Sequence, residues 1–293
     1  MTVDVVCAGP VFLDITFEGL EALPGPGEER FARDLHTTPG GAAITAVGLV
    51  RLGLAAAIVA PLGRDFAGTI LRDQLEAEGV VCAGGRSGRT PVAAVLPVGG
   101  ERAFATFEPS GRVDADTIER LQPRAVVVPL EELELAPEEA VVYATAGQRT
   151  VDRLGRRLRA GGTRVRAVLA NLDEALRLTG ERDADAAALA LAESSETAVV
   201  TCGADGAVAA AAGEVFVVAA PRSEAQDTTG AGDLFVAAYV SADLAGLPLQ
   251  ERLRRAAVYA ALSVRTATGA RSAATFDELE RSLAELDPAI MHE

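Results

Sequence analysis

The residues of this chain best suited to chemistry lie in segment 227–233, whose sequence is DTTGAGD, immediately before an apolar run. A glycine-rich turn that opens a helix leaves backbone N–H groups without partners inside the helix, and these groups bind phosphate well. Gly230, Ala231 and Gly232 would form such an anion hole. Asp233 follows in the first helical turn, where the helix dipole is expected to keep it ionised, so that it can accept a proton from a hydroxyl.

Two other interpretations of the same segment need to be weighed. The glycines can serve close packing alone, with Asp233 capping the helix, and the residues by themselves favour neither this interpretation nor the anion hole. A dinucleotide-binding turn is excluded, because Phe235 stands where a third small residue is needed and residues 223–226 are polar rather than a buried strand.

Composition narrows the chemistry that is available. The chain contains no lysine, so all 27 basic residues are arginines, and its two histidines are His36 and His292. These absences exclude a P-loop lysine and a Schiff base, and they argue against a histidine metal pair or a Ser-His-Asp triad. The 3 cysteines are widely separated and are expected to be reduced core residues. Carboxylates, arginines, hydroxyls and amides remain, and phosphoryl transfer needs little beyond these and Mg²⁺.

Length and charge limit the class of protein and its partners. The 293 residues are 49% hydrophobic without a break in composition, which favours a single α/β domain over residues 1–293. A net charge of −15 repels polyphosphate backbones, so we expect no nucleic-acid partner. Because the sequence has neither an apolar run of transmembrane length nor a basic start typical of signal peptides, we expect no membrane association and a cytoplasmic location.

Strand and helix patterns alternate along the chain, which predicts a mostly parallel sheet covered by helices on both faces. The expected strands of this sheet are 3–8, 56–62, 125–128, 140–143, 165–170 and 197–201, followed by a hairpin over 207–212 and 214–219. The expected helices are 44–52, 67–78, 150–159, one that begins at 171 and is stopped by Gly180, and 234–243, 249–266 and 276–284. Segments at about 15–38 and 88–110 are expected to leave the main sheet and form a small second sheet over the site.

Two further features point to a ligand near the start of the chain. Asp14 follows the first expected strand closely, in the region where open parallel sheets bind ligands, although a role as a turn residue is a serious alternative. Pro39, Gly40 and Gly41 precede an apolar segment and form a second glycine-rich helix start, where a ligand could approach the backbone.

Taken together, these motifs resemble the ribokinase/PfkB family of carbohydrate and nucleoside kinases along nearly the whole chain. The matching segments, in the family's order, are FLD at 12–14, PGG at 39–41, RLG at 51–53, GRDFAG at 63–68, Asn171 with Glu174, LTG at 178–180, TCGADG at 201–206 and DTTGAGD at 227–233. The resemblance implies a ribokinase-like α/β fold, with a mostly parallel sheet flanked by helices and a small β-sheet lid. It also implies ATP-dependent phosphorylation of a hydroxyl on a sugar or nucleoside.

The resemblance also assigns roles to residues. Asp233 would be the base, with Gly230, Ala231 and Gly232 as the anion hole, and Glu174 would lie near Mg²⁺, with water between them. The acceptor would be contacted by Asp14, Gly40, Gly41, Ile44 or Thr45, and Arg102, and the nucleotide by Asn171, Thr201, Gly203, Gly206 and Thr229. A monovalent cation near the anion-hole loop and a homodimer formed through the lid are further expectations of this kind.

Departures from the family pattern concern the acceptor. An asparagine that usually follows the two glycines is replaced by Ile44 or Thr45, depending on the alignment, and Ala144-Thr145-Ala146 stands where many members carry Asp-x-Asn. Ala257 takes the place of an asparagine close to the adenine. We therefore keep two alternatives to a sugar kinase: a nucleoside kinase, and a non-catalytic regulator that binds a sugar or nucleotide on the same fold.

Overall fold

The computed structural model describes residues 2–86, 88–98, 101–109, 113–154, 165–223, 227–265 and 269–286. A large sheet of nine strands has the order β13-β12-β11-β10-β9-β8-β1-β4-β5. Neighbouring strands are parallel from β5 to β11, and the last two, β12 and β13, are antiparallel. The expected mostly parallel sheet is therefore confirmed.

The strands of the large sheet are short and apolar. Their bounds are β1 Val5–Ala8, β4 Ala56–Val59, β5 Val81–Cys82, β8 Ala125–Pro129, β9 Val141–Thr145, β10 Val165–Asn171, β11 Ser195–Thr201, β12 Ala207–Ala211 and β13 Glu214–Val218. In β1, Val5 and Cys7 pack into the core on one face, while Val6 and Ala8 pack on the other. Both faces are thus buried, which explains why the strands read as continuous apolar runs.

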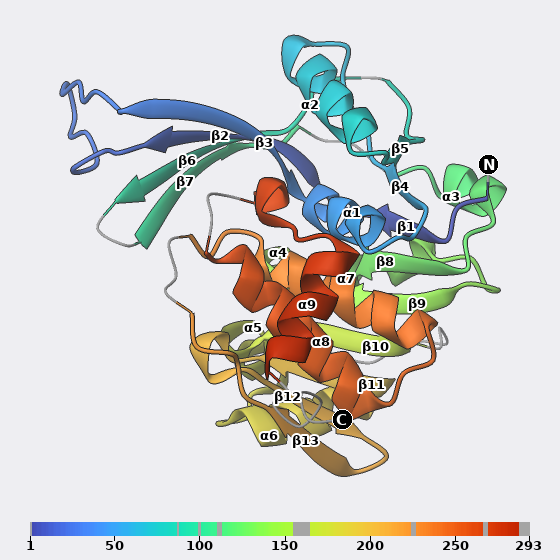
Figure 1. Cartoon of the computed structure of the whole chain (residues 1–293). Coiled ribbons are helices and arrows are strands. Elements are labelled where there is room, and N and C mark those ends of the chain that lie inside the picture. Colours follow the sequence, from blue (N-terminus) through green and yellow to red (C-terminus); the bar gives the residue numbers. More distant parts are fainter. Residues whose placement is uncertain are drawn as a thin grey trace.

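Helices cover each face of this sheet. One face carries α1 Ala42–Arg51, α2 Phe66–Ala77, α7 Ala231–Leu244, α8 Leu249–Ser263 and α9 Phe276–Leu286, most of which are seen in front of the sheet in Figure 1. The opposite face is covered by α3 Ala115–Leu121, α5 Leu172–Thr179 and α6 Ala184–Ala192. Between consecutive strands also lie α4 Gln148–Leu154 and the 3₁₀ helices η1 Leu130–Leu135 and η2 Gly203–Asp205, and η3 Gly269–Ser272 connects α8 to α9.

A second sheet of four strands extends to one side of the molecule (Figure 1). Its order is β3-β2-β6-β7, with β2 Val11–Glu18, β3 Asp34–Gly41, β6 Val92–Val98 and β7 Glu101–Phe107. The central pair, β2 and β6, is parallel, and the two edge strands are antiparallel to their neighbours. The excursions predicted at about 15–38 and 88–110 overlap these strands, and the small sheet begins several residues earlier, at Val11.

Some elements differ from the sequence predictions. Asp14 lies inside β2 and not in a turn, because residues 11–18 pair along their full length with β3. The helices α3 and α6 were not predicted; α6 is alanine-rich and begins at Asp183, whose side chain accepts a hydrogen bond from the N–H of Ala186. The predicted helix 150–159 begins at Gln148, and its residues after 154 lie outside the described part of the chain. Within the described residues, no helix is long and apolar enough to span a membrane.

Candidate active site

The candidate site lies where the carboxyl ends of several strands of the large sheet meet the small sheet. A cavity of about 290 Å³ opens there. Its walls come from the ends of β1, β8 and β9, from the start of β2 and from the first turns of α1, α4 and α7. The carboxyl edge of an open parallel sheet is the usual place for a ligand, so the topology itself favours this cavity as the site.

Asp233 reaches this cavity from the first turn of α7. Gly230 is the N-cap of this helix and has φ 78°, a left-handed conformation that favours glycine. The backbone carbonyl of Asp233 accepts a hydrogen bond from Thr45 Oγ1 at 3.2 Å, which ties the start of α7 to α1. The first turn of α7, which carries Asp233, is therefore fixed against α1.

The prediction that the helix dipole keeps Asp233 ionised is wrong for this structure. Burial, with the charges of Asp14 and Glu174 adding to it, raises the pKa of Asp233 to about 7. The dipole contributes only about half a charge, which desolvation and two neighbouring carboxylates outweigh. Asp233 therefore exchanges its proton near neutral pH, in the range suited to a general base.

The two glycines of the anion-hole loop have different surroundings. A Cβ on Gly230 would lie 3.0 Å from Ile44 Cδ1 and 3.2 Å from the Cα of Gly269, so this glycine is packed on its inner side. A Cβ on Gly232 would meet no atom within 4 Å. Packing thus explains Gly230, whereas the open space beside Gly232 is available to a ligand.

The same contact locates Ile44. Ile44 is 2% exposed and its side chain lies beneath Gly230, which favours a place in the core over the contact with the acceptor that the resemblance implied. Thr45 is the residue of this pair that lines the cavity.

Asp14 is the second acid near the site. Asp14 is 9% exposed and does not line the cavity itself, although Phe12 on the same strand does; burial raises the pKa of Asp14 to about 7. A Cβ on Gly40 would come within 2.3 Å of the Asp14 carboxylate, so the absence of a side chain at Gly40 creates the space in which Asp14 lies. Gly41, one residue further on, lines the cavity.

Asn171 and Glu174 form a capping box at the start of α5. The N–H of Glu174 donates to Asn171 Oδ1 at 2.9 Å, and the N–H of Asn171 donates to Glu174 Oε2 at 3.0 Å. Burial raises the pKa of Glu174. The negative charge of Glu174 in turn contributes to the raised pKa of Asp233. Asn171 and Glu174 thus cap the start of α5. The second carboxylate oxygen of Glu174, Oε1, takes no part in this cap and could face a hydrated cation.

The remaining residues assigned to the nucleotide lie at and after the end of β11 and directly before α7. Thr201 ends β11 and is the register partner of Asn171, and Gly203 and Gly206 flank the turn that follows. Thr229 Oγ1 is buried and has no hydrogen-bond partner among the described residues. Arg102 lies in β7, but its side chain is outside the described part of the structure.

The cavity also brings in side chains that the sequence analysis missed. Glu131 follows β8, accepts a hydrogen bond from the buried Thr150 Oγ1 and lines the cavity. Arg149, after β9, forms an ion pair with Glu108, which directly follows β7, so this pair links the small sheet to the large one across the cavity. Glu131 and Arg149 come just after strand ends, and that position was the signal that could have identified them.

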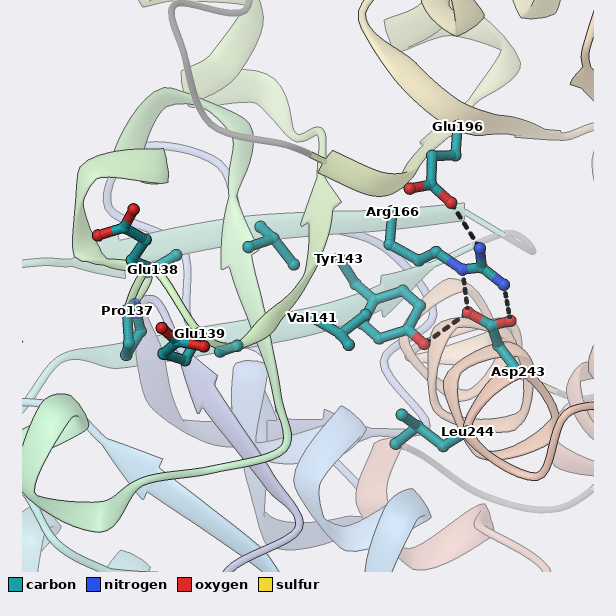
Figure 2. A pocket seen from close by; sticks show the side chains of 12 residues that line it. Pro137, Glu138, Glu139, Val141, Tyr143, Arg166, Glu196, Asp243 and Leu244 are labelled. Atoms are coloured by element: carbon teal, nitrogen blue, oxygen red, sulfur yellow. Dashed lines mark hydrogen bonds and ion pairs between the residues drawn. The ribbon is translucent and has the colours of Figure 1, made fainter.

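A larger hollow, of about 810 Å³, lies at the opposite edge of the sheet (Figure 2). There Arg166 donates to both oxygens of Asp243, at 2.8 and 2.7 Å, and also pairs with Glu196. Tyr143 donates to Asp243 at 2.6 Å. Arg252 also pairs with Asp243, so two arginines balance Asp243 and Glu196, and these carboxylates are committed to ion pairs. Nowhere in the described residues do three or more His, Cys, Asp or Glu side chains form a group able to hold a metal ion.

Comparison with known proteins agrees with this geometry. Residues 4–275 match the family described as pfkB family carbohydrate kinase. The chain therefore belongs to the pfkB family, which confirms the resemblance and the enzyme class predicted from the sequence.

Individual relatives and solved structures are similar to this chain over different shares of its length. Over 127 residues it is 38% identical to a 2-dehydro-3-deoxygalactonokinase of Haloferax volcanii, a match that spans 42% of this chain and 40% of the relative. A putative ribokinase from Agrobacterium tumefaciens superposes with a TM-score of 0.79 at 22% identity, covering 98% of this chain and 99% of the other. A putative ribokinase II from E. coli, solved with ATP and Mg²⁺, gives 0.78 at 20% identity, covering 97% and 99%. These structures confirm the ribokinase-like fold.

Proposed function

We propose that this protein is an ATP-dependent kinase that phosphorylates a hydroxyl of a sugar or sugar acid, with Asp233 as the general base. The observation that carries the proposal is the placement of Asp233. It faces the cavity directly after the glycine loop, has a pKa near 7, and no cation among the described residues forms an ion pair with it. A carboxylate with only a packing role would not need this combination.

In the proposed reaction, Asp233 accepts the proton of the acceptor hydroxyl while the oxygen forms a bond to the γ-phosphorus of ATP. The bond from that phosphorus to the bridging oxygen breaks, and ADP leaves with the electron pair. The N–H of Ala231 donates to the carbonyl of Thr228 at 3.3 Å. The N–H groups of Gly232 and Asp233 have no acceptor four residues back within the helix and would hold the transferring phosphoryl group. The open side of Gly232 leaves room for it.

The residues present fit a magnesium ion carried by the nucleotide. Glu174 is a half-buried carboxylate near Asp233 and would hold the ion through water, and Mg²⁺ would neutralise charge on the phosphates. Asn171, Thr201, Gly203 and Gly206 would border the nucleotide. The unpartnered hydroxyl of Thr229 is a candidate ligand for either a phosphate or a monovalent cation.

The acceptor would lie between Asp14, Gly41, Thr45 and Glu131, whose oxygens and backbone can bind hydroxyls. Among the described residues that line this cavity, Arg149 is the one cation. Its ion pair with Glu108, in which the side chains are 35% and 34% exposed, is weak enough to exchange partners. A carboxylate on the acceptor could take the place of Glu108. The name of the Haloferax relative also favours a 2-dehydro-3-deoxy sugar derivative as the acceptor.

The test is a screen of ATP consumption with purified protein against neutral pentoses and hexoses, 2-keto-3-deoxy sugar acids and nucleosides. We expect turnover with a sugar or sugar acid, and Arg149→Gln should weaken the use of acids more than that of neutral sugars. Turnover with nucleosides alone would favour the nucleoside kinase. Binding of sugar and nucleotide without turnover would favour the regulator. A homodimer through the small sheet and a cytoplasmic location stay predictions.

A further inference from the structure

Segment 63–68, GRDFAG, has no part in the proposed chemistry, yet it makes a dense set of hydrogen bonds. Asp65 is the N-cap of α2, and its Oδ1 accepts from the N–H of Gly68 at 2.9 Å. The same carboxylate accepts from Thr90 twice, from Oγ1 at 2.7 Å and from the N–H at 3.0 Å. Thr90 Oγ1 also accepts from the N–H of Gly63 at 2.9 Å. We call these four residues, Gly63, Asp65, Gly68 and Thr90, the Asp65–Thr90 anchor.

The anchor permits little movement. Thr90 is 1% exposed. A Cβ on Gly68 would lie 2.3 Å from the carbonyl oxygen of Gly63 and 2.5 Å from Thr90 Oγ1, so the segments touch without any intervening side chain. Burial acts to raise the pKa of Asp65, but the hydrogen bonds from Thr90 and Gly68 outweigh it and lower the pKa. The bonds are therefore made to an ionised carboxylate, which strengthens them.

The anchor directly precedes β6, where the chain returns to the small sheet after α2. Strand β6 begins at Val92, two residues after Thr90, and pairs with β2 so that Ala93 is the register partner of Asp14. The N–H of Leu13 donates to the carbonyl of Pro91 at 3.0 Å, which joins β2 to the segment between the anchor and β6. The backbone that carries Asp14 is therefore held by the chain that leaves the anchor.

We propose that Asp65 and Thr90 are positioning residues for the acceptor: by fixing the start of β6 against α2, the anchor fixes β2 and holds Asp14 two residues beyond Phe12, the β2 residue that lines the cavity. The inference rests on the proposed function only in assigning Asp14 to the acceptor. Asp233 lies on α7, and no hydrogen bond of the anchor reaches that helix. The anchor therefore acts on acceptor binding and leaves ATP binding unaffected.

The test uses three threonine variants. Thr90→Val removes the hydroxyl while keeping the shape, and Thr90→Ser restores it. Thr69→Val is the matched control, because the hydroxyl of Thr69 bonds the backbone carbonyl of Asp65 at 3.2 Å in the same helical turn but is exposed. Loss of one buried hydrogen bond leads us to expect a KM for the acceptor about tenfold higher in Thr90→Val. The KM for ATP should be unchanged, and Thr90→Ser and Thr69→Val should resemble wild type.

A second readout does not depend on catalysis. Amide hydrogen exchange in 11–18 and 92–98 should be faster in Thr90→Val than in wild type, and unchanged in Thr69→Val. A Thr90→Val protein that loses only thermal stability, with wild-type acceptor KM and wild-type exchange in these strands, would overturn the proposal. If wild type phosphorylates no acceptor, the proposed function fails, while the exchange comparison still decides whether the anchor holds the small sheet.

Discussion

Helix α7 carries two aspartates, Asp233 in its first turn and Asp243 near its end, in opposite surroundings. Figure 2 shows Asp243 bound by Arg166 and Tyr143, and Arg252 also pairs with it. Although burial acts to raise the pKa of Asp243, these partners lower it. Asp233 has carboxylates as its charged neighbours, and its pKa is raised. The same residue type on one helix thus forms an ionised structural link at one end and, in the proposed mechanism, the proton acceptor at the other.

For the proposed function, neither burial nor the size of the adjacent cavity identifies which end of α7 carries the catalytic aspartate. The larger hollow adjoins Asp243, whose charge is already balanced, and the smaller cavity adjoins Asp233. Asp233 differs from Asp243 in that no cation among the described residues forms an ion pair with it, which lowers stability and is typical of functional sites.

The largest effect is expected from Asp233→Asn. It removes the proton acceptor while keeping the shape, so kcat should fall by roughly 10²–10⁴-fold, with the KM for ATP nearly unchanged. Steady-state kinetics with the best acceptor measure this. The matched control is Asp243→Asn, the same substitution on the same helix, which should leave kcat of the folded protein unchanged. If Asp233→Asn keeps wild-type turnover, Asp233 is not the base.

Asp243→Asn should instead reduce stability. It leaves two arginines without their shared counter-charge in a buried site, which we expect to lower the free energy of unfolding by about 3 kcal/mol. Urea denaturation measures the change. Glu196→Gln neutralises another carboxylate bound to Arg166 at a more exposed position, and should cost less than about 1 kcal/mol. Equal losses in the two variants would contradict the structural role assigned to Asp243.

The smallest effect concerns the pH dependence of stability. The folded-state pKa of Asp233 is raised from its usual 3.8 to about 7, so the native state binds this proton more tightly than the unfolded chain does. Its contribution is fully present below about pH 4 and is lost as the pH rises through about 7.

Asp233→Asn should remove this loss of folding stability at high pH. At pH 8 the variant should be more stable than wild type by about 1–3 kcal/mol, with little difference at pH 4. Urea midpoints at the two pH values test this. For Asp243 the sign is reversed: its pKa is lowered, so its contribution is present above its usual pKa and is lost as the pH falls below about 4. Parallel curves for wild type and Asp233→Asn would show that Asp233 titrates normally.

The sequence alone determined the type of sheet, the glycine loop at the start of α7 and the acid that follows it. Such features are local: strand alternation, a glycine with positive φ and an apolar helix are fixed by neighbouring residues. The same local view predicted the capping glycine after α5 but missed α6, whose alanine-rich sequence has little amphipathic pattern.

Only the tertiary structure decided how these parts work together. The pKa of Asp233 depends on burial and on Asp14 and Glu174, which are far from it in sequence, so the helix dipole alone did not predict the raised pKa. Ile44 lies in the core, where Gly230 packs over it. Glu131 and Arg149 line the cavity because the strand ends that precede them meet at one edge of the sheet. Desolvation and charge interactions act through space, and a linear pattern of residues does not contain those distances.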